Sequence, residues 1–120
     1  MQRKIYKNHP PVPQALQEAL KDYPELIAGL QEVLVTTGVT LFMSKMQRTD
    51  QFELALASLE GRLGTYMSNA AKEVQAAEAT GDAALIAKAK EKKMLMIGCR
   101  GGKLSRSVAE LKTFFRWGED

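Results

Sequence analysis

One amphipathic stretch, residues 50–80, constrains the fold of this chain more than any other feature. It opens with Asp50 and Glu53 at the spacing of a helix-capping box. Within it, apolar or small residues recur at alternating steps of four and three, which places them along one narrow line of an α-helix. This seam consists of Phe52, Leu56, Leu59, Leu63, Tyr66 and Ala70. The stretch therefore predicts a long helix that packs on a partner, either the next helix of the chain or a second copy.

A turn signal follows directly at residues 80–82, where Gly81 is suited to end one helix and Asp82 to cap the next. We expect an antiparallel helical hairpin over residues 50–97, and alanines near its turn would let the two arms approach closely. The second arm has no clear apolar face, because its four lysines between residues 88 and 93 point in different directions around a helix axis. They do not form a one-sided phosphate-binding stripe. The apolar run at 94–97 is expected to be surrounded by protein or not helical.

The N-terminal part divides at its prolines. Residues 1–12 are expected to form an extended arm, and Pro13 suits the first turn of a helix. An amphipathic pattern then continues to Leu34 but is interrupted by Pro24, which predicts two helices or one kinked helix. Residues 33–41 are rich in β-branched side chains, which favour strands. Helix is the prediction here, and a small two-stranded element with residues 94–97 is the alternative.

The stretch MLMIGCRGGKLS, residues 94–105, has the order of a phosphate-binding loop. A Walker loop is excluded, because only three residues separate Gly98 from Gly102 and Leu104 stands where the hydroxyl is required. We predict a flexible glycine-rich connector at 98–104 and a C-terminal helix at 105–117. A weaker alternative is a turn that binds phosphate at the N-terminus of that helix.

The sequence predicts no catalytic site, no metal site and no cofactor. The single histidine, His9, and the single cysteine, Cys99, are ninety residues apart, and no pair of residues has metal-ligand spacing. Cys99 is expected to be a semi-buried thiol whose pKa its cationic neighbours would lower if it were exposed. The protein is therefore predicted not to be an enzyme.

The charge distribution is polarised, although the net charge is only +3. Residues 88–120 contain nine cations and four acids, whereas residues 8–87 contain five cations and ten acids. The candidate contacts for a partner or a phosphate are Arg100, Lys103, Arg106, Lys112, Arg116 and Trp117. Two interpretations stay open: these residues meet an acidic partner such as nucleic acid, or they meet the acidic middle of the same chain.

Chain length and composition complete the fold prediction. With 120 residues, 45% of them apolar, the chain has the size of one domain and is rich in helix formers. We predict an all-α fold, a single helical bundle of four to six helices around the long hairpin. The stretch MQRKIYKNHPP has no apolar h-region and does not read as a secretion signal, so a cytoplasmic location is expected. Residues 26–43 approach the length of a membrane span, but Gln31 and Glu32 lie in the middle, so no membrane is predicted as a partner.

These features favour function by contact. The first hypothesis is a small non-enzymatic protein-binding or assembly module, such as an adaptor, an inhibitor or a structural subunit. It would act through helical surfaces on a protein partner or on itself as a homo-oligomer. The alternative is an accessory or regulatory nucleic-acid-binding protein that uses its basic C-terminal part.

Overall fold

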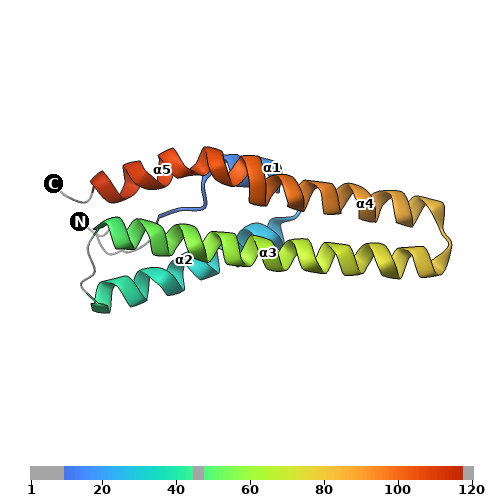
Figure 1. Ribbon diagram of the computed structural model, residues 1–120, viewed down its shortest axis with the longest axis horizontal. Coiled ribbons are helices and arrows are strands. Elements are labelled where there is room, and N and C mark those ends of the chain that lie inside the picture. Colours follow the sequence, from blue (N-terminus) through green and yellow to red (C-terminus); the bar gives the residue numbers. More distant parts are fainter. Residues whose placement is uncertain (1–9, 45–47, 118–120) are drawn as a thin grey trace.

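Two long antiparallel helical segments organise the computed structural model (Figure 1), which describes residues 10–44 and 48–117, with side chains at 10–37 and 51–114. The first segment is α3, Arg48–Thr80, which contains the whole seam. The second consists of α4 (Ala83–Gly98), a π-helical turn η2 (Cys99–Lys103) and α5 (Leu104–Trp117), which follow one another without a break. The molecule is elongated, with extents of 56 × 25 × 23 Å.

The hairpin turn is built from the two residues that the sequence singled out. Gly81 has a φ of 73°, in the left-handed region that favours glycine. The Asp82 carboxylate then accepts hydrogen bonds from the backbone N–H groups of Ala84 and Leu85, at 3.0 and 3.3 Å. These bonds satisfy donors of the first turn of α4 that have no partner within the helix.

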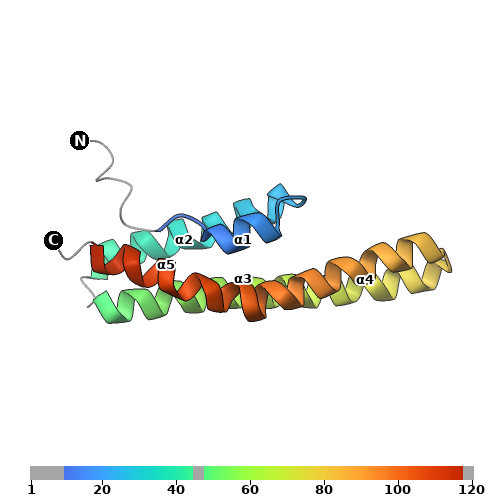
Figure 2. The ribbon, with the colours of Figure 1, turned by 90° about the horizontal axis from the view of Figure 1, so that it is seen from above.

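A second layer covers only part of the hairpin. It consists of α1, Gln14–Ala19, and α2, Pro24–Ser44. Helix α2 packs along α3, and α1 packs against η2 and α5 (Figure 2). Pro24 starts α2 after a short turn, which confirms the interruption predicted there. Residues 33–41 and 94–97 are helical, so the alternative of a small β-element is wrong.

The core lies where the two layers meet. Among the residues whose side chains are described, its largest fully buried side chains are Leu16, Leu20, Leu30, Leu34, Leu59, Leu63, Met96 and Leu111. The all-α bundle around a long hairpin is confirmed, with no strand in the described ranges 10–44 and 48–117. No helix among these residues is long and apolar enough to span a lipid bilayer.

The glycine-rich segment is helical, so the prediction of a flexible connector at 98–104 is wrong. Buried residues occur at Met96, Cys99, Leu104, Ser107 and Leu111, in steps of three, five, three and four. A step of five is too long for one turn of α-helix, and the π-helical turn at 99–103 contains the extra residue. Cys99 and Leu104 therefore both face the core, and the helix continues through the glycines.

The apolar run at 94–97 also differs from the prediction. It is helical and only Met96 is fully buried, whereas Met94 is 65% exposed and Ile97 is 39% exposed. The reason is that only the Met96 side of this part of α4 faces the core, whereas Met94 and Ile97 lie on a side that meets solvent.

Candidate functional site

The far half of the hairpin projects from the bundle as a pair of helices. The second layer ends at the turn between α1 and α2, which contains Tyr23. Beyond that turn, no further helix of the described chain lies over α3 and α4 (Figures 1 and 2). The two arms are held together by small or short side chains, since Ala70, Val74 and Ala77 of α3 are buried between them. A two-helix projection of this kind leaves a groove between its helices open.

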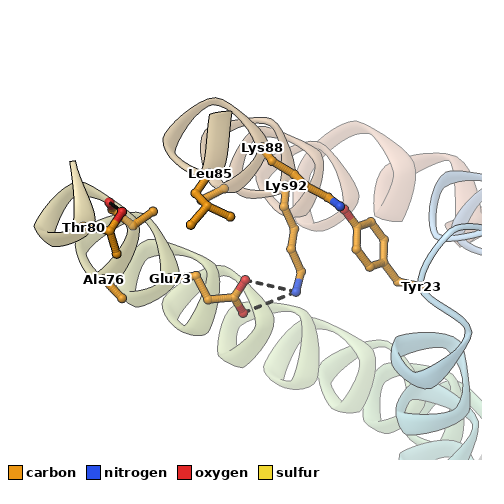
Figure 3. Close-up of a pocket in the computed structure, with 9 residues that line it drawn as sticks. Tyr23, Glu73, Ala76, Thr80, Leu85, Lys88 and Lys92 are labelled. Atoms are coloured by element: carbon orange, nitrogen blue, oxygen red, sulfur yellow. Dashed lines mark hydrogen bonds and ion pairs between the residues drawn. The ribbon is translucent and has the colours of Figure 1, made fainter. Parts of the chain in front are cut away.

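This groove lies on the side of the hairpin where the second layer ends, and it has a volume of about 390 Å³ (Figure 3). Its floor consists of Ala76 and Ala77 of α3 and Ala89 of α4, and Leu85 of α4 forms an apolar wall. Leu85 is 49% exposed and adds apolar surface to the groove. The groove combines a concave shape with exposed apolar surface, which is typical of contact sites.

Charged groups frame one end of the groove. The Lys92 ammonium donates to both carboxylate oxygens of Glu73, at 3.1 and 3.3 Å. The same ammonium lies 5.0 Å from the centre of the Tyr23 ring, within cation–π range. Lys92 therefore connects the hairpin to the turn of the second layer, and its charge is balanced.

Lys88 is the groove cation whose charge is not balanced. It is exposed, and the described part of the chain provides no ion-pair partner for it. Figure 3 shows its side chain extending from α4 toward the Tyr23 end of the groove. With Lys88, Lys92 and Glu73 as its charged lining residues, the groove has a formal charge of +1. An apolar floor with a cationic edge is chemically suited to an amphipathic, acidic ligand.

The seam predicted from the sequence is used inside the chain. Leu59, Leu63 and Ala70 are buried, and Phe52, Leu56 and Tyr66 are partly buried against the same core. The Tyr66 hydroxyl donates a hydrogen bond to the Leu26 carbonyl of α2 at 2.8 Å. The seam residues therefore pack within one chain, against the core that α2 and the second helical segment complete.

The predicted basic contacts lie on the η2–α5 segment but do not form one patch. Arg100 forms an ion pair with Glu60 of α3 at 3.8 Å, and the Lys112 ammonium lies 5.9 Å from the centre of the Phe52 ring. Arg106 is exposed and Lys103 is half-buried. Lys112 is six positions after Arg106, so the two side chains differ by roughly 120° around the helix.

Two of these cations therefore contact the chain's own α3. Arg116 and Trp117 belong to the last turn of α5, and their side chains lie outside the described residues.

Cys99 is more deeply buried than predicted, with a fully inaccessible side chain. Burial raises the pKa of its thiol, and the nearby positive charge of Lys103 lowers it by a smaller amount. The thiol is therefore held in its neutral form, which is a poor nucleophile. No group of three or more His, Cys, Asp or Glu side chains within the described ranges is placed to hold a metal ion. His9 lies outside those ranges.

The groove was missed by sequence reasoning, although part of its signal was present. The alanines near the hairpin turn predict a close approach of helices, but not that one side stays open. Tyr23 and Lys92 are far apart in the sequence and meet only because the second layer ends beside the hairpin.

Comparison of the chain with protein-family models, with curated proteins and with solved structures gave no match.

Proposed function

We propose that this protein is a non-enzymatic protein-binding module, of the adaptor or inhibitor type, whose working surface is the open face of the projecting hairpin. The observation that carries the proposal is the uncovered groove between α3 and α4, with exposed Leu85 beside a floor of alanines. In the bundle half of the molecule, the same pair of helical segments is covered by α1 and α2. A partner on the groove would complete that second layer.

Site-specific photo-crosslinking in cells that express the protein tests this proposal. A photoreactive amino acid at position 76, in the groove, is expected to crosslink the chain to one specific protein. The same amino acid at position 113, an exposed site on α5, is the control and is expected to attach none. Equal labelling from both positions, or no adduct from either, would contradict the proposal.

Nucleic-acid binding is the second candidate, because the α4–α5 segment, residues 83–117, contains nine cations and two acids. Binding of this kind weakens steeply with salt, since cations on the phosphate backbone release counterions. Retention on DNA and RNA columns across a salt series, for the wild type and for Lys103→Gln/Arg106→Gln, tests it. Retention of the variant is expected to fall less steeply with salt than retention of the wild type. If the wild type is not retained even at low salt, this candidate is excluded.

Self-association stays a prediction, and sedimentation velocity at several protein concentrations tests it. The seam is used within one chain, so an oligomer would need another surface. A concentration-independent monomer would contradict the prediction of a homo-oligomer.

A further inference from the structure

We infer that the hairpin groove binds an acidic amphipathic helix of a partner protein. This inference rests on the proposed protein-binding function and specifies the chemistry of the partner. The groove is formed by residues 73–80 of α3 and 85–92 of α4, together with Tyr23 at one end. Eight residues of α-helix extend over roughly 12 Å, so a helix of two to three turns matches its length.

The floor of the groove selects a helix with an apolar face. Ala76, Ala77 and Ala89 have no side-chain atoms beyond Cβ, so larger side chains of a partner helix can approach the two backbones closely. Leu85 forms an apolar wall near the hairpin turn and is half exposed in the free protein. Burial of this surface favours association by roughly 25 cal/mol per Å² of apolar area, before the costs of binding.

The edge of the groove selects negative charge on the rest of that helix. Lys88 has no counter-charge among the described residues, and Lys92 is already paired with Glu73. A carboxylate on the partner that approaches Lys88 gains attraction without breaking an existing ion pair. A basic partner would meet both lysines at the same edge, which is repulsive.

A second copy of the chain fits the groove less well. Suppose that two copies pack groove to groove with their hairpins pointing in opposite directions. The two-fold axis that relates them then places α4 of one copy on α4 of the other. Each copy would then bring its own Lys88, which is near the middle of the α4 lining, toward Lys88 of the other copy. The parallel arrangement is blocked, because α1 and α2 stand on the groove side of the hairpin in both copies.

Fluorescence anisotropy with a designed peptide tests the inference on the full-length chain. The probe is a labelled, end-capped helix of about 16 residues, with Leu and Ala on one face and Glu on the other. The matched peptide has every Glu replaced by Lys. We expect saturable binding of the acidic peptide and at least about tenfold weaker binding of the basic one, a difference of about 1.4 kcal/mol.

Two pairs of variants locate the site. Lys88→Glu is compared with Lys90→Glu, and Ala76→Arg with Ala79→Arg; all four positions are exposed, and only the first of each pair lines the groove. Circular dichroism and thermal melting confirm that each variant folds. We expect Lys88→Glu and Ala76→Arg to weaken binding about tenfold or more, and the two controls to change it less than about twofold.

Three results would overturn the inference. The first is that the basic peptide binds as tightly as the acidic one. The second is that the control variants lose as much affinity as the groove variants. The third is that the wild type is a dimer and Ala76→Arg dissociates it, because that result assigns the groove to a second copy. If the acidic peptide does not bind but position 76 still crosslinks a protein in cells, the inference fails while the proposed function stands. If neither occurs, both fail.

Discussion

The phenolic hydroxyl of Tyr66 on α3 lies directly against Gly29 on α2, where a Cβ atom would collide with it. The same hydroxyl donates to the Leu26 carbonyl at 2.8 Å. Arg62, one turn before Tyr66, donates to the Gly29 carbonyl at 3.2 Å. The contact between α2 and α3 therefore depends on a missing side chain and on two hydrogen bonds to backbone carbonyls.

Replacement of Gly29 by Ala is expected to destabilise the protein by about 1–3 kcal/mol, because the added methyl group displaces Tyr66. Gly61→Ala is the matched control. Gly61 is exposed within α3 and a Cβ there meets nothing, so this variant is expected to gain about 0.5–1 kcal/mol. Urea denaturation measures both effects. Equal effects of the two substitutions would contradict the role of the Tyr66 contact.

The double variant Gly29→Ala/Tyr66→Phe tests the same contact by rescue. Tyr66→Phe alone is expected to cost about 0.5–1.5 kcal/mol through the lost hydrogen bond. Since Phe lacks the hydroxyl, the double variant should be more stable than the sum of the single effects predicts. If the two losses of stability measured by urea denaturation are strictly additive, the added methyl group does not act through the Tyr66 hydroxyl.

Stability is expected to fall at alkaline pH through Tyr66. Burial raises the pKa of its phenol, while the hydrogen bond and the charge of Arg62 act in the opposite direction. Above the unfolded pKa of about 10, the unfolded state loses its proton first. Stability contributed by the protonated phenol is therefore complete below that pH and is lost as pH rises through the folded pKa.

Urea midpoints measured from about pH 9 to about pH 12 should decline less steeply in Tyr66→Phe than in the wild type. Other groups titrate in both proteins, so the difference between the two curves isolates Tyr66. Parallel curves would disprove a raised pKa.

Deletion of Gly102 is expected to be tolerated. It shortens the step between Cys99 and Leu104 from five residues to four, which one turn of α-helix accommodates. Deletion of Ala57, an exposed residue within α3, is the control. It rotates half of α3 by about 100° relative to the other half and turns leucines away from the core.

Thermal unfolding followed by circular dichroism distinguishes the two deletions. The chain without Gly102 should unfold cooperatively within a few degrees of the wild type, whereas the chain without Ala57 should lack a cooperative transition. If both deletions prevent folding, the π-helical turn does more than contain an extra residue.

Asp82→Ala is expected to cost about 1 kcal/mol, because two N–H groups of α4 lose their side-chain acceptor. Glu78→Ala removes a carboxylate one turn earlier without removing a cap, and should change stability by less than about 0.5 kcal/mol. Guanidinium denaturation of both variants measures the difference. A similar loss in both would indicate a general effect of negative charge near the turn.

Cys99 should react with a thiol reagent only when the chain opens. Its side chain is inaccessible and burial raises the pKa of its thiol. In native buffer, labelling by a disulfide reagent is expected to be many times slower than in denaturant. Fast native labelling would mean that the helix opens at the π-helical turn.

The hairpin was predictable because its signals are local. Steps of four and three from Phe52 to Ala70 define a helix face, and Gly81 with Asp82 marks the turn. The π-helical turn was not predictable in the same way. A five-residue step between Cys99 and Leu104 looks like a loss of helical pattern, and two adjacent glycines suggest flexibility when no packing partner is known.

The groove depends on tertiary structure. Its floor is visible in the sequence as alanines, but its open side depends on where α1 and α2 end. The length of α1 and the turn before Pro24 determine that end, and they bring Tyr23 beside Lys92. No spacing in the sequence relates these two residues, so the edge of the site could not be derived from a pattern.

The continuity of α4, η2 and α5 has a consequence for recognition. A glycine hinge would let the projecting arm swing, and any ligand would then have to immobilise it at an entropic cost. A helix that runs unbroken from the tip of the arm into the bundle instead holds the groove at a set orientation relative to the core. The proposed binding face is thus held in place before any partner arrives, and substitutions in the bundle that leave η2 helical should not change its orientation.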